Sequence, residues 1–188
     1  MKNISDREII ESVKKGNQKD FALLVDKYKN KAFSLLKRMI KNDMEAEEIL
    51  QDCFLKAYKG LSNFRGDSEF STWFYKIVYN TALSRLTVKK RLIESRMESV
   101  EDHHGISYSD IAPEVELKDL LQFLNRMVED LPPDYSAVVS LFYQDSLSCQ
   151  EIAKVMETSV SNVKVLLYRA RNTLKDILLK KNLIRELT

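Results

Sequence analysis

Apolar residues recur at steps of three and four along most of the chain, which is the spacing of one helix face. In the first half the pattern covers residues 21–39, 43–61 and 70–81, after a short stretch at 5–15. In the second half it covers 116–130, 134–143, 148–156 and 160–170. In the segment 43–61 the residues expected to face inward are Ile49, Leu50, Cys53, Phe54, Ala57, Tyr58 and Leu61.

Several predicted helices carry their own start signals. Ser5 with Glu8, and Ser148 with Glu151, are capping boxes, in which each side chain satisfies a free backbone amide at the helix start. Asn42 is a further predicted cap. The chain holds only four Gly and three Pro, which leaves few hairpin turns. The sequence therefore predicts an all-α fold.

A length of 188 residues suits two small helical domains. The periodicity is lost in residues 96–113, RMESVEDHHGISYSDIAP, which are acidic and polar and contain Gly and Pro. We expect this segment to be a mobile, solvated linker between a domain at 1–95 and a second at 114–188.

The net charge of +2 says little about nucleic-acid binding, but the charged residues are unevenly distributed along the chain. Basic residues gather at 85–96 and 164–185, on either side of an acidic stretch at 98–119. No signal-peptide pattern and no apolar run of about 18 to 20 residues is present. Cys53 and Cys149 are isolated and are predicted to be reduced core thiols. We therefore expect a cytoplasmic protein.

Catalytic and metal chemistry find little support in the sequence. A di-iron site in a helical bundle requires Glu-x-x-His pairs, whereas His103 and His104 lie in the predicted linker. No nucleophile stands at a plausible spacing from a base. We expect no enzyme activity, no catalytic residue, no metal and no cofactor.

Residues 148–171 have the pattern of a helix-turn-helix, with a capped short helix, the turn 157–159 and a helix with a basic outer face. Such a second helix fits the major groove of duplex DNA. A basic helix face taken alone is also compatible with simple solvation, but the preceding capped helix and turn favour DNA binding. The residues predicted to contact DNA are Ser159, Ser161, Asn162, Lys164, Val165, Tyr168, Arg169 and Arg171.

Two long segments resemble one family in order. LPPDYSAVVSLFYQDSLSCQEIAKVMETSVSNVKVLLYRARNTLKDIL resembles the C-terminal domain of extracytoplasmic-function sigma factors of the sigma-70 family. AEEILQDCFLKAYKGLSNFRGDSEFSTWFYKIVYNTAL resembles their N-terminal domain. The resemblance implies a polymerase subunit that directs promoter recognition, promoter melting and transcription initiation in response to a stress or envelope signal.

The resemblance also implies three contact surfaces. Glu48, Gln51 and Asp52 would dock on the clamp helices of the largest subunit of core RNA polymerase, although without the family they suggest only a solvated face. The recognition helix would bind the duplex minus-thirty-five element. The single-stranded minus-ten element would meet Lys56, Ser62, Asn63, Phe64, Arg65, Tyr75, Lys76, Asn80, Ser84 and Arg85.

Within the minus-ten set, Phe64 and Tyr75 offer stacking surfaces, Asn63 and Asn80 can contact base edges, and the cationic residues can neutralise phosphates. Trp73 is expected to pack in the core rather than to contact a base. Ser84 replaces the Asp of many relatives, and Ser161-Asn162 replaces a common Gly-Thr, so base preference cannot be copied from the family.

The resemblance further implies a cognate anti-sigma factor. The lack of a long apolar run predicts that this chain does not insert into a membrane. Two other hypotheses remain open from the sequence. One is a dimeric helix-turn-helix regulator that acts without being a polymerase subunit. The other is a helical interaction module with no role at DNA.

Overall fold

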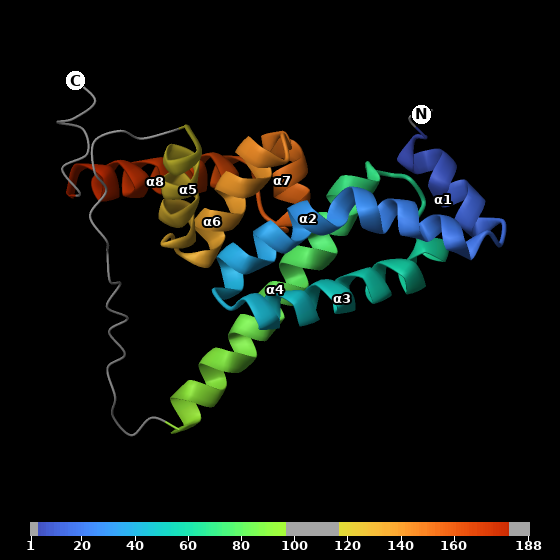
Figure 1. The fold of residues 1–188 in the computed structure, drawn as a ribbon, viewed down its shortest axis with the longest axis horizontal. Helices are drawn as coiled ribbons and strands as arrows, with labels where there is room; N and C mark the ends of the chain where they lie inside the picture. Colours follow the sequence, from blue (N-terminus) through green and yellow to red (C-terminus); the bar gives the residue numbers. More distant parts are fainter. Residues whose placement is uncertain (1–3, 97–116, 181–188) are drawn as a thin grey trace.

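The computed structural model describes residues 4–96 and 117–180 (Figure 1). Within these ranges every regular element is helical and no strand occurs, which confirms the predicted all-α class. The helices are α1 (Asp6–Lys14), α2 (Phe21–Ile40), α3 (Asp43–Gly60), α4 (Phe70–Arg96), α5 (Leu117–Glu129), α6 (Pro133–Val139), α7 (Cys149–Val155) and α8 (Val160–Lys180).

The predicted helix starts are confirmed. The Ser5 hydroxyl accepts from the backbone N–H of Glu8, whose carboxylate accepts from the Ser5 amide at 2.8 Å. Ser148 and Glu151 repeat this arrangement at α7, with the same 2.8 Å distance. At α3 the Asn42 side chain accepts from the N–H of the residue three positions on, at 2.9 Å. Local side chains thus satisfy amides that the helices leave unpaired.

The N-terminal half is built on the packing of α2, α3 and α4. Aromatic rings fill its centre: Phe54 stacks on Phe74 with centroids 4.7 Å apart, and Tyr28 meets Phe70 edge-on at 5.4 Å. Tyr58 departs from its predicted inward position, because 36% of its surface is exposed while its ring rests against Phe21 at the edge of the core.

In the C-terminal half, α6 and α7 both pack against α8. The helix predicted for 134–143 is not uniform: α6 ends at Val139 and a turn of π-helix, Ser140–Gln144, follows. The wide turn closes with the Asp145 N–H bonded to the carbonyl of Ser140 at 3.2 Å. It directs Asp145 toward the N-terminal half, where the side chain is used as described below.

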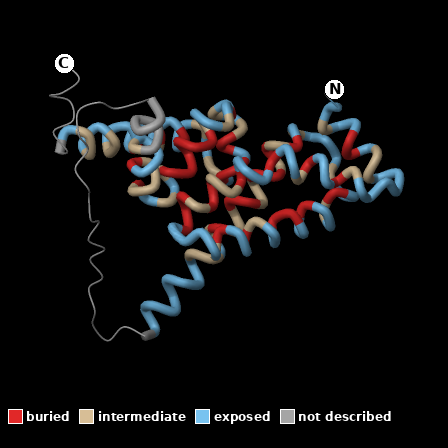
Figure 2. Tube along the Cα trace, viewed as in Figure 1, coloured by how far each residue is buried: buried red, intermediate tan, exposed pale blue. Residues whose placement is uncertain are grey.

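The two halves pack against one another rather than standing apart. α2 lies against α6 and α4 lies against α7, and the buried apolar residues of both halves form one cluster (Figures 1 and 2). The distal end of α4 leaves this body, and its residues 87–95 are exposed (Figure 2). Most of the predicted linker, residues 97–113, lies outside the described residues, whereas Arg96 belongs to α4.

Candidate nucleic-acid and protein interfaces

The outer face of α3 carries the predicted docking residues. Glu48, Gln51 and Asp52 are all exposed there. Met44 and Leu55 lie at the matching helical positions, with 85% and 57% of their surfaces exposed. Sequence reasoning missed these two apolar residues, although their helical phase, opposite to that of Ile49 and Cys53, was a usable signal. The face is therefore acidic with apolar ends, a composition suited to a protein partner.

Ion pairs join this face to α4. Arg85 donates to Glu48 at 3.0 Å and lies 3.9 Å from Glu45, while Lys89 lies 3.6 Å from Glu45. The hydrogen bond and charge of Glu48 raise the pKa of Arg85. A predicted minus-ten residue is thus paired with a predicted docking residue. The contact fixes the angle between the exposed face of α3 and the beginning of the basic segment of α4.

A cavity of about 480 Å³ lies between α3 and α4. It brings together four of the predicted minus-ten residues, Lys56, Lys76, Asn80 and Ser84, with Trp73. The Lys56 ammonium donates to the Thr81 hydroxyl at 3.1 Å, and the Ser84 hydroxyl donates to the Asn80 carbonyl at 2.8 Å. The cavity therefore combines cations, an amide and an aromatic wall, which are the groups that hold an unstacked base and its phosphate.

Trp73 serves two surfaces. It is partly buried against the core, with its ring 5.0 Å from that of Phe64 and 5.6 Å from that of Phe70. The predicted packing role is thus present, but the same ring also lines the cavity between α3 and α4. Gly60 allows this position, because a Cβ there would lie 3.2 Å from the indole.

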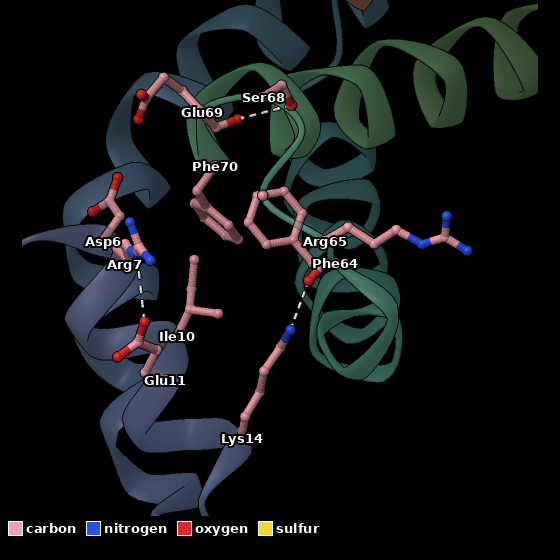
Figure 3. A pocket seen from close by; sticks show the side chains of 11 residues that line it. Asp6, Arg7, Ile10, Glu11, Lys14, Phe64, Arg65, Ser68, Glu69 and Phe70 are labelled. Atoms are coloured by element: carbon pink, nitrogen blue, oxygen red, sulfur yellow. Dashed lines mark hydrogen bonds and ion pairs between the residues drawn. The ribbon is translucent and has the colours of Figure 1, made fainter.

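The loop after α3 faces a different cavity, of about 370 Å³, between the loop and α1 (Figure 3). The Lys14 ammonium donates to the Phe64 carbonyl at 2.6 Å and holds the loop to α1. Phe64 packs its ring against Phe70, whereas the Arg65 side chain extends away from α1 (Figure 3). Ser62 and Asn63 are exposed. These four predicted residues therefore do not line the cavity that holds Asn80.

Tyr75, also predicted to meet the minus-ten strand, is only 1% exposed. Its hydroxyl donates to Asp145 at 2.6 Å, and Lys31 lies 3.5 Å from the same carboxylate. Burial raises the pKa of Tyr75 and also that of Asp145, where the hydrogen bond from Tyr75 and the nearby cations act in the opposite direction. In this arrangement Tyr75 is an interface residue between the two halves.

Glu157, in the turn before α8, reaches two further predicted residues. Its carboxylate lies 2.7 Å from the Lys76 ammonium and accepts from the Asn80 amide at 3.3 Å. These contacts lower the pKa of Glu157, with the hydrogen bond from Lys76 the largest cause. The acidic side chain thus sits at the rim of the cavity between α3 and α4.

The helix-turn-helix consists of α7, the turn and α8. All predicted contact residues of α8 are exposed, including Val165 at 42% and Tyr168 at 66%. The Ser159 hydroxyl accepts from the Asn162 N–H at 3.1 Å and so caps α8. Arg171 donates to the Tyr143 hydroxyl at 2.8 Å, which holds its guanidinium beside the π turn that follows α6.

The part of the chain that the structure describes contains neither a candidate metal site nor a helix that could span a membrane. No group of three or more His, Cys, Asp or Glu there is arranged to hold a metal ion. None of the described helices combines the length and apolar character needed to cross a membrane. Cys53 is buried and Cys149 partly buried, both as free thiols, and burial raises the pKa of Cys53 to about 11.

The fold and the exposed face of α8 define an all-helical protein of the helix-turn-helix class. Residues 24–92 match the family described as Sigma-70 region 2, and residues 122–174 match Sigma-70, region 4. The chain belongs to the sigma-70 family of RNA polymerase sigma factors and is of the extracytoplasmic-function type.

Full-length relatives support this assignment. The chain is 35% identical to the ECF RNA polymerase sigma-E factor of Escherichia coli K12 over 178 residues, which cover 91% of this chain and 93% of the relative. It is 32% identical to the RNA polymerase sigma-H factor of Pseudomonas aeruginosa over 176 residues, or 90% and 91% of the two chains. Both relatives bear the names of sigma factors rather than of enzymes.

Solved structures share the fold. The sigma factor RpoE in complex with the anti-sigma factor NepR, from Bartonella quintana, has a TM-score of 0.67 at 19% identity, covering 85% of this chain and 97% of that one. CnrH in complex with the cytosolic domain of CnrY has a TM-score of 0.64 at 21% identity, covering 92% and 96%.

Proposed function

We propose that this chain confers promoter specificity on core RNA polymerase through three surfaces, and that its parts divide at 1–95, 96–113 and 114–188. The observation that carries the proposal is the cavity between α3 and α4, which gathers Lys56, Lys76, Asn80, Ser84 and Trp73. Its groups match what a base turned out of the melted minus-ten element requires. Stacking on an aromatic side chain contributes about 1 to 3 kcal/mol per base.

The exposed face of α3 is the proposed docking surface for the clamp helices of the largest polymerase subunit. Three polar residues would complement a basic and polar partner, speed encounter and set the register. Met44 and Leu55 would add apolar contact at the two ends of this surface.

The proposed partner of α8 is the duplex minus-thirty-five element. Its exposed side chains Lys164, Arg169 and Arg171 carry cations that can contact guanine or phosphate, and Asn162 can pair with adenine. The Ser159 hydroxyl is engaged as an acceptor at the helix cap but retains its own proton to donate to a phosphate.

An anti-sigma factor is the proposed regulatory partner, responding to an envelope or other stress. The two solved complexes named above each contain a protein of this fold with a protein partner, which supports this extension. The cytoplasm, where transcription takes place, is the proposed site of action.

Transcription with purified core polymerase tests the proposal. The chain should convert core enzyme from non-specific to specific initiation, with start sites downstream of a shared two-part sequence. Absence of association with core enzyme would contradict it. Recovery of palindromic sites that the chain binds without polymerase would favour a dimeric regulator instead.

A further inference from the structure

The outer face of α8 has an apolar centre between charged edges. Successive residues of a helix are turned by about 100°, so Val165 points away from the buried Val163. Measured from Val165 around the helix axis, Arg169 lies about 40° to one side. Lys164 and Arg171 lie about 100° and about 120° to the other side. The middle of this face is therefore uncharged, and cations border it on both sides.

The fold does not explain why Val165 is exposed. Its surface is 42% exposed, so the side chain contributes little to the core. Valine is also a poorer helix former than Ala, Lys, Arg or Gln, because the helix restricts its branched side chain. Tyr168, which follows on the same side of the helix, is 66% exposed. Two apolar side chains thus lie on a face where solvation and helix stability both favour polar residues.

Neighbouring side chains hold the groups at the edges of this face. At one edge, the side-chain amide of Asn162 donates to the Thr158 hydroxyl at 2.9 Å. At the other edge, the Arg171 guanidinium carbon lies 5.6 Å from the centre of the Tyr143 ring, whose hydroxyl accepts from the same guanidinium. Side chains that are already ordered lose less entropy when they bind. The two edges are thus preorganised to bind the phosphates that border a groove, with Val165 between them.

The major groove offers an apolar group to the centre of this face. All four bases present hydrogen-bond donors or acceptors there, whereas only thymine also presents a C5 methyl group. An aliphatic side chain cannot pair with the polar groups, and covering them without a partner is unfavourable. Val165 would therefore favour thymine over the other three bases.

We propose that Val165 is a specificity-determining residue of the minus-thirty-five contact, and that it packs against the C5 methyl group of a thymine. This inference rests on the proposed function, in which α8 binds duplex DNA. It divides the face by chemistry. The groups at the edges contact phosphates and contribute affinity for any sequence, whereas the apolar centre selects the base.

Replacement of thymine by uracil tests the proposal, because it removes the methyl group and leaves the hydrogen-bonding groups in place. Duplexes would first be selected from a random pool with the full-length chain bound to core polymerase. Each thymine of the selected upstream element would then be replaced in turn, and the affinity of the same complex measured. At one position the affinity should fall about fourfold, the factor that corresponds to burial of one methyl-sized group.

The variant Val165→Ser should bind the thymine and uracil duplexes equally, because its side chain is too short and too polar to bury the methyl group. Leu179→Ser is the matched control. Leu179 is 48% exposed on the same helix, about 21 Å along the axis from Val165, and its replacement should preserve the fourfold loss.

Three results would overturn the role of Val165 and leave the proposed function standing. They are an upstream element without thymine on either strand, no loss of affinity at any position, and an equal loss in Val165→Ser and wild type. Failure of the selection to enrich any duplex would overturn the proposed function and this inference with it.

Discussion

At the scale of single residues, substitution of Asp52 distinguishes a role in docking on polymerase from a role in the fold. Its side chain is exposed on α3, and among the carboxylates that raise the pKa of Arg85 it makes the smallest contribution. Asp52→Arg should weaken binding to core polymerase about tenfold, because it sets like charges against each other at the interface. The thermal midpoint should stay within a degree or two of wild type. Binding measured by competition with a labelled wild-type chain checks this.

The matched control is Asp176→Arg, which reverses an exposed carboxylate on α8, far from the docking face. It should leave polymerase affinity unchanged. Equal affinity of Asp52→Arg and wild type would remove Asp52 from the proposed docking surface.

Gly60 offers a second test, in which a single methyl group alters the cavity between α3 and α4. Gly60→Ala brings a Cβ to 3.2 Å from Trp73, so the ring must move by a few tenths of an ångström. Stability should be unchanged or higher by up to about 1 kcal/mol, because alanine favours the helix. Affinity of the polymerase complex for single-stranded DNA of the minus-ten element should fall, and the Trp73 emission should shift. Unchanged affinity would exclude Trp73 as a wall of the base site.

At the scale of elements, the proposed role of α8 as the recognition helix predicts how binding to duplex DNA depends on salt concentration. Arg169 is exposed on the outer face of α8. Arg169→Ala should weaken binding to promoter duplex by about tenfold, and if the contact is to a phosphate it should reduce the slope of log affinity against log salt by about 0.9. Fluorescence anisotropy over a salt series measures both. An unaltered affinity, with Lys175→Ala as the comparison, would argue that Arg169 is merely solvated.

The capping box of α7 predicts how the stability of the protein depends on pH. Its hydrogen bonds with Ser148 lower the pKa of Glu151 below 4.5. A carboxyl whose folded pKa is lowered stabilises the protein fully above its unfolded pKa, and this contribution is lost as pH falls through the folded value. At pH 7, Glu151→Gln should therefore have a lower thermal midpoint than wild type. The difference between the two midpoints should become smaller below pH 4. A constant difference across this range would contradict the role of the charge.

Helix boundaries were predictable where the determining chemistry is local. Ser5, Asn42 and Ser148 each bond to an amide three residues on, so the sequence contains both partners of the cap. The π turn at Ser140–Gln144 was not predictable in this way. This turn places Ser140 and Gln144 against Arg38 of α2. The apolar pattern of residues 134–143 does not indicate a contact with a residue so distant in the sequence.

At the scale of the whole molecule, the sequence did not predict that the two halves pack against one another. Arg38 and its acceptors are separated by 87 to 106 positions, and each residue alone suggests a solvated helix face. Tyr75 and Asn80 were predicted as nucleic-acid contacts from the family resemblance, which carries no information about what covers them in the free chain. The candidate surfaces were therefore accessible to prediction, whereas their mutual occlusion depends on tertiary packing.

The size of the free chain tests that packing. A compact chain of 188 residues has an expected radius of gyration of about 16 Å, and separated halves give a distinctly larger value. Arg38→Glu would bury a carboxylate near Glu129 and Asp145, whose charges already act on the Arg38 guanidinium. It should expand the chain in X-ray scattering while the far-ultraviolet dichroism keeps its helical amplitude, because α2, α3 and α4 still pack on one another, as do α6 and α7 on α8. Arg7→Glu, on the exposed face of α1, should leave the size unchanged. A compact Arg38→Glu chain would mean that apolar packing alone holds the halves together, and that the polar contacts to Tyr75, Lys76 and Asn80 result from this packing rather than cause it.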